Sequence, residues 1–217
     1  MVACPYRLPI TDYGPPPRRL PRSRLFLTTP STPASSRDRL LAAAAERLAS
    51  AGAAALSLQD VAQGAGVSKG LIHYHFRDRE ALLVETVDWL AALAVRRERR
   101  ALAEVSPAGA VDAMWRWLDA ELARGELRVL VELAGAREER VRDAARTAAE
   151  ARRDAAAETV RTLFSTLALR PRVEPEMLAE AIVAFIDGLA VQTALDPGTN
   201  PRVAFDVFWL GMLGLAE

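Results

Sequence analysis

Residues 57–76 read SLQDVAQGAGVSKGLIHYHF, and this stretch decides the fold. Ser57 and Ser68 each precede an apolar run, and two glycines at residues 64–66 separate the runs. A serine in such a position accepts a hydrogen bond from a free backbone N–H in the first helical turn, so each serine predicts a helix start. Glycine adopts backbone angles that end a helix. The stretch therefore predicts two short helices joined by a tight turn.

A further helix is expected on each side of this pair. Five apolar residues before it share one face at the helical period, namely Leu40, Leu41, Ala44, Ala45 and Leu48. Gly52 follows where a C-terminal glycine ends a helix. After the pair, Asp78 is a candidate N-cap for a fourth helix. Three short helices with a glycine-containing turn between the second and third predict a helix-turn-helix unit, whose last helix enters the major groove of DNA.

The rest of the sequence predicts long helices with short breaks at glycines and prolines. We expect these helices over about 79–104, 108–123, 126–135, 138–169, 175–195 and 201–215. No alternating strand pattern occurs in the sequence, and its 42 alanines favour helix. The chain is therefore predicted to be all-α. An N-terminal three-helix helix-turn-helix domain over 36–83 is followed by a C-terminal helical domain over 84–217.

Composition limits the class of protein. The chain has 217 residues, a formal net charge of zero and one cysteine, Cys4, so an intrachain disulfide scaffold is excluded. Its apolar runs are shorter than a membrane span needs, and prolines and arginines interrupt the N-terminus, so we expect a cytoplasmic protein without a membrane partner. The charge is +4 over 1–36 and −5 over 84–217. This asymmetry suggests a polyanion partner at one end, or is chance variation of a solvated surface.

Residues 1–35 contain eight of the 13 prolines, which predicts an extended, mostly disordered tail. Its arginines could reach a DNA backbone or minor groove. The alternatives are a passive tail or a start site assigned too early.

Residues 37–83 strongly resemble the DNA-binding domain of the TetR family of transcriptional repressors, over about a fifth of the chain and without a gap. The caps, glycines, apolar positions and aromatic cluster agree together in segments 37–41, 57–62, 65–70 and 74–76. The GLIHYHF stretch and the apolar C-terminus also resemble the BetI branch of the family. The resemblance implies a homodimer that binds a palindromic double-stranded DNA operator and is released by a small-molecule inducer.

The expected DNA contacts combine this resemblance with the chemistry of the residues. They are Ser57, Ser68, Lys69, Gly70, Leu71, His73, Tyr74, His75 and Arg79. Hydroxyls and N–H groups at helix starts bind anions, and Gly70 lets backbone approach a phosphate. Leu71 could meet a thymine methyl. His73 stands where the family most often has tyrosine, and it either contacts DNA or packs. Phe76 is expected in the core.

The last two helices are markedly apolar. The C-terminal one has apolar residues nearly all round, so it is either central core or covered by a second subunit. The resemblance implies dimerisation through them. The expected interface residues are Phe185, Gly188, Leu189, Gln192, Phe205, Trp209, Met212 and Leu213.

A ligand pocket is predicted between the long helices, although such apolar stripes also occur as plain core. The expected lining is Trp89, Met114, Trp115, Trp117, Leu118, Leu130, Phe164 and Phe185. Glu132 lies in an apolar run and faces either a ligand or solvent.

The sequence thus predicts a ligand-responsive regulator, most simply a repressor. Three alternatives stay open: a helical ligand-binding or scaffold protein of the same fold without specific DNA binding, an activator or nucleoid-type binder, and an enzyme. An enzyme is disfavoured because the P-loop and GxGxxG patterns are missing from the sequence. His73 and His75 point about 200° apart on a helix, so we expect no metal site and no cofactor.

Overall fold

The computed structural model describes residues 35–103, 105–106, 109–167, 169–196 and 198–215. Over these residues the chain forms nine α-helices, one 3₁₀ turn and no strand, which confirms the all-α prediction. In chain order they are α1 Ser36–Ala51, η1 Ala53–Ala55, α2 Leu58–Gly64, α3 Lys69–His75, α4 Arg79–Leu102, α5 Ala110–Arg124, α6 Glu126–Ala134, α7 Glu139–Thr166, α8 Pro175–Leu195 and α9 Pro201–Leu213. The predicted tail before Ser35 lies outside the described residues.

Helix α1 begins and ends where local chemistry requires. The Ser35 side chain accepts from the Asp38 N–H at 3.1 Å, and the Asp38 carboxylate accepts from the Ser35 N–H at 3.3 Å. This reciprocal pair is a capping box, which satisfies two backbone donors that would otherwise be unpaired. Gly52 ends the helix at φ 76° and ψ 171°, a conformation essentially restricted to glycine that costs other residues about 1–3 kcal/mol. The five predicted apolar residues of α1 are all buried.

The helix-turn-helix forms as predicted. Ser57 accepts from the Asp60 N–H at 3.1 Å, and Ser68 accepts from the Leu71 N–H at 3.2 Å. Gly66 makes the turn between α2 and α3 at φ 64°. Beneath α3, the side chains of Ile72 and Phe76 are fully buried. Removing such a buried side chain costs about 3–5 kcal/mol, so these two residues fix the orientation of α3.

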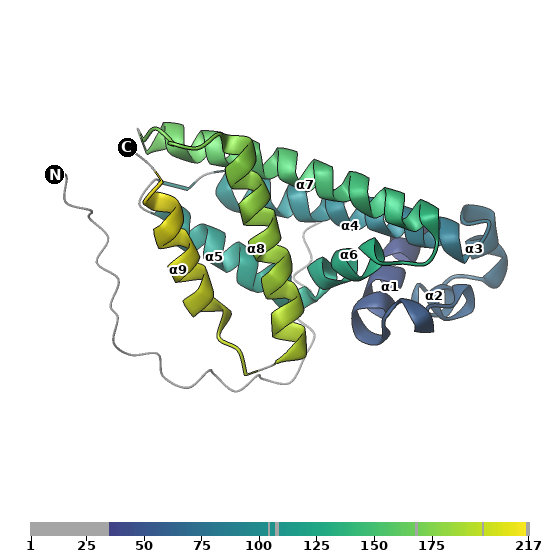
Figure 1. Cartoon of the computed structure of the whole chain (residues 1–217). Helices are drawn as coiled ribbons and strands as arrows, with labels where there is room; N and C mark the ends of the chain where they lie inside the picture. Colours follow the sequence, from purple (N-terminus) through teal and green to yellow (C-terminus); the bar gives the residue numbers. More distant parts are fainter. Residues whose placement is uncertain (1–34, 104, 107–108, 168, 197, 216–217) are drawn as a thin grey trace. The chain divides into compact units, whose positions relative to one another are not determined.

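Helix α4 connects the helix-turn-helix with the helices that follow. It starts at the end of α3, packs on α1 and runs along α7, with α8 crossing α7 (Figure 1). One continuous core cluster extends from Leu40 in α1 through Leu90 in α4 and Leu133 in α6 to Ile186 in α8. The division near residue 83 therefore falls inside a continuous helix and a continuous core, and it stays a prediction.

Helix α8 is long and apolar enough to cross a membrane by length and composition alone, with a mean hydropathy of 1.6 over its most apolar window. In this fold it packs against α7, α6, α5 and α9 instead. Only 33% of that window is buried. The helix therefore has an apolar side that the described part of the chain leaves uncovered.

Candidate DNA interface and ligand cavity

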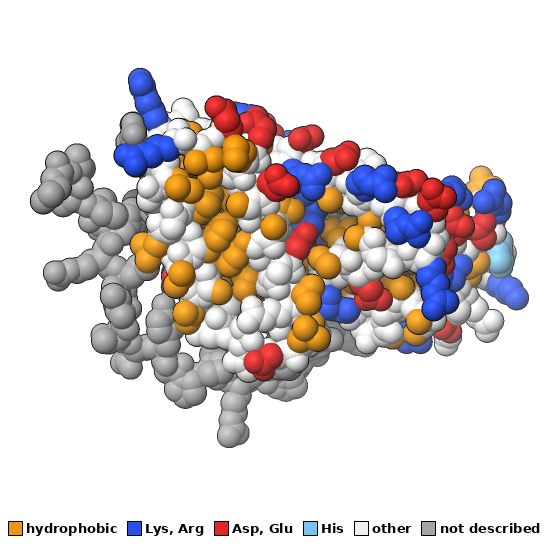
Figure 2. All heavy atoms as spheres, in the orientation of Figure 1, with side chains coloured by type: hydrophobic (Ala, Val, Ile, Leu, Met, Phe, Trp, Pro, Cys, Tyr) orange, Lys and Arg blue, Asp and Glu red, His pale blue; other side chains and the backbone are white. Residues whose placement is uncertain are grey.

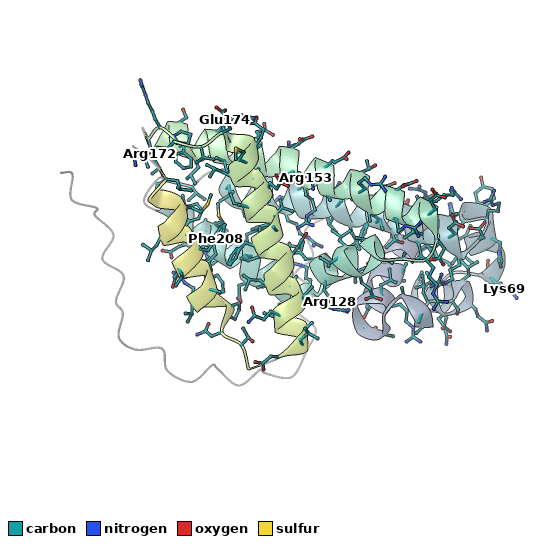
Figure 3. All side chains as sticks on the ribbon, in the orientation of Figure 1. Lys69, Arg128, Arg153, Arg172, Glu174 and Phe208 are labelled. Carbon is teal, nitrogen blue, oxygen red and sulfur yellow. The ribbon has the colours of Figure 1, made fainter. Side chains whose placement is uncertain are left out.

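Helix α3 presents a polar face above its apolar seam. Lys69, Gly70, His73 and Tyr74 are exposed, and the Tyr74 side chain is 82% exposed. Figure 3 shows Lys69 on the outer side of the helix pair, directed away from the other helices. At this end Figure 2 shows acidic side chains together with basic and histidine side chains that can donate hydrogen bonds. Donation of hydrogen bonds is the chemistry that phosphates and base edges require.

Gly70 is not required by the fold. A Cβ atom built there would meet nothing closer than the Ser68 hydroxyl at 3.9 Å, and its φ is not positive. Glycine in a helix costs up to about 1 kcal/mol relative to alanine. The absence of a side chain therefore leaves exposed backbone that another molecule can approach closely.

His75 differs from the other predicted contacts because part of its ring is used inside the chain. Its Nε2 lies 2.8 Å from the Ser36 hydroxyl, and its ring meets Tyr74 edge-on with centroids 5.2 Å apart. The contact ties the end of α3 to the start of α1. Sequence reasoning missed Ser36, because its partner lies 39 residues further along the chain. Leu71 and Ser57 are half-buried.

The structure gives Arg79 a role other than the expected phosphate contact. Its guanidinium donates to the carbonyls of Ala53 and Leu56, at 2.5 and 3.2 Å, and to the Glu138 carboxylate at 2.8 Å. All three nitrogens are thus engaged within the chain. Arg79 fastens the first turn of α4 to η1 and to the start of α7, and we leave it out of the candidate interface.

A second attachment joins α6 to the end of α1. Glu132 Oε1 accepts from the Ala53 N–H at 2.9 Å, and its Oε2 accepts from Arg128 at 3.1 Å. Arg128, labelled in Figure 3, also donates to the Ala49 carbonyl at 2.8 Å. Glu132 is exposed to solvent, one of the two expected alternatives, and its carboxylate also holds the helix-turn-helix to the rest of the chain. We call Arg128, Glu132 and their two backbone partners the α6 clamp.

An enclosed cavity of about 50 Å³ lies among α4, α5, α6, α7, α8 and α9. A wider hollow of about 260 Å³ adjoins it and shares Met114, Thr159 and Leu163 with it. The cavity wall is mainly apolar. Its apolar side chains include Met114, Leu127, Val160, Leu163, Phe164, Ile182, Val183, Ile186 and Met212.

The expected pocket residues agree with this lining only in part. Met114, Trp117 and Phe164 line the cavity. Trp89, Trp115, Leu118, Leu130 and Phe185 do not, and each packs against or within the main core. Trp115 packs on Phe205, and Phe185 stacks on Phe208 with ring centroids 4.1 Å apart. Helical spacing identified apolar faces, but not which of them borders a void.

Five polar side chains interrupt the apolar wall. Glu98 accepts from the Thr159 hydroxyl at 2.9 Å, and Arg152 donates to Asp187 outside the lining at 2.6 Å. Burial raises the pKa of the Glu98 carboxyl, against the opposing effects of the Thr159 hydrogen bond and the Arg152 charge.

The other two polar groups of the cavity are indoles. The Nε1 atoms of Trp117 and Trp209 are buried and have no hydrogen-bond partner among the described residues. A buried donor left unpaired costs about 1–3 kcal/mol. Both side chains line the cavity, so its wall contains two buried donors without a partner among the described residues.

The apolar faces of α8 and α9 are arranged differently from the expected interface. Leu189, Phe205, Trp209 and Met212 are buried within the chain, and the side chain of Leu213 lies outside the described residues. Phe185 is half-buried, whereas Gly188 and Gln192 are exposed. This corrects the inward-facing part of the prediction.

The uncovered apolar residues of α9 are Val203, Val207 and Leu210, which are 39%, 66% and 45% exposed. They recur at i, i+4 and i+7, so they share one side of α9. A Cβ at Gly188 or Gly211 would meet nothing within 4 Å. Apolar side chains spread over α8 and α9 in Figure 2. We call Gly188, Gln192, Val203, Val207, Leu210 and Gly211 the outer α8–α9 face.

Comparison with known families matches most of the described chain. Residues 40–86 match the model of bacterial regulatory proteins of the tetR family, and residues 107–206 match that of the BetI-type transcriptional repressor C-terminal domain. The first match contains α2 and α3. The second contains α5 to α8, which supply much of the cavity wall.

Two curated relatives match part of the chain. The HTH-type transcriptional repressor KstR2 of Mycolicibacterium smegmatis is 41% identical over 66 residues, which cover 29% of this chain and 32% of the relative. The HTH-type transcriptional regulator BetI of Ectopseudomonas mendocina is 40% identical over 81 residues, 36% of this chain and 41% of the relative. The chain thus aligns with less than half the length of each.

Solved structures share the fold at greater length. A TetR-family transcriptional regulator from Rhodococcus sp. superposes with a TM-score of 0.69 and 22% identity, covering 83% of this chain and 97% of that one. Reduced NemR from E. coli superposes with a TM-score of 0.65 and 17% identity, covering 84% and 98%. From its helix-turn-helix, its helical C-terminal domain and the two matched family models, the chain belongs to the TetR family of transcriptional regulators.

Proposed function

We propose that this chain is a repressor that binds a palindromic DNA operator as a homodimer and releases it when a small molecule enters the cavity. The observation that carries the proposal is the exposed polar face of α3 on a fully buried apolar seam. A rigid helix with exposed donors is what major-groove recognition needs. Such a protein works in the cytoplasm, where the DNA is.

The proposed contacts divide by their chemistry. Lys69, the hydroxyls of Ser68 and Tyr74, and the backbone at Gly70 suit phosphates, which fix position. His73 and Leu71 suit base edges, which carry sequence information. Ser57 and His75 are kept as proposed contacts of the second rank, because each is half-buried as well as hydrogen-bonded within the chain. Ser68 also caps a helix, but it is exposed.

Dimerisation is supported by the outer α8–α9 face. Monomeric proteins seldom expose a continuous apolar surface of this kind, and glycines permit close approach of helices from two subunits. A two-fold pair of α8 and α9 helices would form a four-helix interface. Such a dimer would carry one α3 helix in each subunit, and each helix would contact one half-site of the palindromic operator.

Ligand response is supported by the position of the cavity. Its wall includes Ala94, Val95 and Glu98 of α4, and α4 begins at the end of α3. The wall also includes Leu127 of α6, the helix that carries the α6 clamp. A ligand acts only by preferring one arrangement of these helices over the other. The cavity is therefore in contact with both helices that reach the helix-turn-helix.

The test is a fluorescence-anisotropy titration with DNA from immediately upstream of the chain's own gene, at two salt concentrations and with excess nonspecific competitor. We expect tight binding to survive the competitor. Lys69→Ala should weaken binding to all sequences and lower the salt slope by about one, because one phosphate contact is lost. Arg146→Ala, which removes an exposed arginine from α7, serves as the control and should change neither quantity.

Two results would count against the proposal. Binding that disappears under competitor would favour a nonspecific binder or a scaffold of the same fold. The operator could also lie outside the upstream fragment, and repeating the titration on sheared genomic DNA tests that explanation. A salt slope unchanged in Lys69→Ala would remove Lys69 from the interface.

A further inference from the structure

We propose that the cavity takes a neutral, elongated, mainly apolar molecule that carries a hydrogen-bond-accepting oxygen, such as a ketone or an ester. The inference rests on the proposed function, because it names the chemical class of the ligand for the same cavity. Four properties of the lining carry it: shape, apolar wall, unpaired donors and balanced charge.

The shape favours an elongated ligand. The enclosed part, about 50 Å³, is too small for a bulky ring system. The adjoining hollow of about 260 Å³ shares Met114, Thr159 and Leu163 with it, so a molecule that occupies both must be narrow enough to pass these three side chains. The surrounding Val160, Leu163 and Phe164 side chains favour burial of methylene groups.

The unpaired donors require an acceptor. Trp117 and Trp209 come from α5 and α9, and both line the enclosed cavity. Their buried Nε1 atoms have no partner among the described residues. An indole N–H only donates, so neither can be satisfied by an ammonium group or by a hydrocarbon. A carbonyl or ester oxygen that comes within hydrogen-bond distance of either Nε1 would satisfy it.

The charge balance argues against an ionic ligand. Arg152 is paired with Asp187 at 2.6 Å, so its charge is already compensated and a carboxylate ligand would gain no free cation. Glu98 is the acid of the enclosed cavity, and its Oε1 accepts from the Thr159 hydroxyl. The adjoining hollow adds Arg99 and Glu158, which pair with each other at 2.7 Å. Burial raises the pKa of the Glu98 carboxyl, against the opposing effects of the Thr159 hydrogen bond and the Arg152 charge. Binding of a neutral ligand therefore transfers no unpaired charge from water into the cavity.

The probes are three seven-carbon molecules that differ only in the end group: 2-heptanone, heptanoate and heptylammonium. Each is titrated into the full chain without DNA, and binding is followed by calorimetry and by the thermal unfolding midpoint. We expect 2-heptanone to bind at least tenfold more tightly than either ion and to raise the midpoint with concentration.

Two variants test the donors. Trp117→Phe and Trp209→Phe keep an aromatic ring and remove the N–H, and we expect each to weaken 2-heptanone binding about five- to tenfold. Trp115→Phe is the matched control, because Trp115 packs on Phe205 and does not line the cavity. Glu98→Gln removes the carboxylate charge and keeps an acceptor for Thr159, so it tests whether any affinity for heptylammonium depends on that charge.

Each contrary result overturns the inference in a defined way. Preference for heptylammonium, lost in Glu98→Gln, would assign an organic cation. Preference for heptanoate would assign an anion. No binding of any probe, or unchanged affinity in both tryptophan variants, would remove the donors from the ligand site. DNA binding is measured separately by anisotropy, so 2-heptanone that binds without releasing DNA keeps the ligand class and refutes the ligand response.

Discussion

A substitution at Gly70, in the first turn of α3, should affect DNA binding without lowering the stability of the fold. Gly70→Ala adds a methyl group that meets nothing closer than 3.9 Å in the chain, so the unfolding midpoint should stay the same or rise slightly. If backbone at this position approaches a phosphate, the methyl group intervenes. We expect operator affinity to fall about tenfold, as measured by fluorescence anisotropy.

Gly66 provides the matched control, because its constraint is conformational. It has open space around a Cβ but a φ of 64°, so Gly66→Ala should lower stability by about 1–2 kcal/mol in urea denaturation. Stability loss in Gly70→Ala, or full DNA affinity with an intact fold, would contradict the role given to Gly70.

Glu98 predicts a pH dependence of stability. Since burial raises the pKa of its carboxyl above the ordinary value of 4.5, the folded chain binds this proton more tightly than the unfolded chain does. Stability from this group is therefore present below pH 4.5 and is lost as pH rises through the folded pKa. Glu98→Gln does not ionise, so its thermal unfolding midpoint should exceed that of the parent at pH 7.5. The difference should shrink toward pH 4.5, and a difference that widens there would contradict the assignment.

At the scale of elements, the α6 clamp is the connection most open to test. Glu132→Ala removes the acceptor of the Ala53 N–H. We expect the free energy of unfolding to fall by about 1 kcal/mol, since the carboxylate is partly exposed. Amide hydrogen exchange at Ala53 and the end of α1 should accelerate. Glu132→Gln keeps an acceptor and should retain most of the protection.

Asp143→Ala is the control for this experiment. It removes one carboxylate from an exposed ion pair with Arg146 on α7, and such pairs contribute about 0–1 kcal/mol. Unchanged exchange at Ala53 in Glu132→Ala would mean that other contacts hold α6 to α1.

The helices were predictable from sequence because their ends depend on local chemistry. Ser57, Ser68 and Asp78 cap helices through backbone groups three residues away, and Gly52 and Gly66 supply positive φ. The contacts that join the elements were not predictable. Arg79 meets Glu138, and Glu132 meets Ala53, across 59 and 79 residues, and a polar residue gives no local sign of so distant a partner.

The cavity and the outer α8–α9 face were predictable only as regions. Because α9 is apolar nearly all round, its pattern does not distinguish the inward Trp209 from the outward Val207. Trp115 and Trp117 belong to the same predicted helix, yet of the two only Trp117 lines the cavity. Which apolar residue borders a void depends on how several helices pack, and periodicity does not encode that.

At the scale of the whole molecule, Leu210→Glu tests the proposed dimer. Leu210 is 45% exposed on the outer α8–α9 face, so the substitution should be tolerated by the single chain. Burying a carboxylate between two subunits without a partner costs several kcal/mol, so we expect a monomer at micromolar concentration in analytical ultracentrifugation. Operator affinity should fall at least tenfold.

Thr147→Glu adds the same charge on an exposed position of α7 and should leave the mass unchanged. A Leu210→Glu chain that remains dimeric would place the interface on another surface.

The most direct test of the central claim is selection of DNA from a random-sequence duplex library by the full chain, followed by sequencing. If two α3 helices of a homodimer read DNA, the enriched sequences should contain two inverted half-sites at a fixed spacing set by the helical repeat of DNA. Enrichment should be lost in Leu210→Glu and weakened in Gly70→Ala. Absence of any enriched sequence, or a single half-site kept by Leu210→Glu, would contradict a dimeric, sequence-specific regulator.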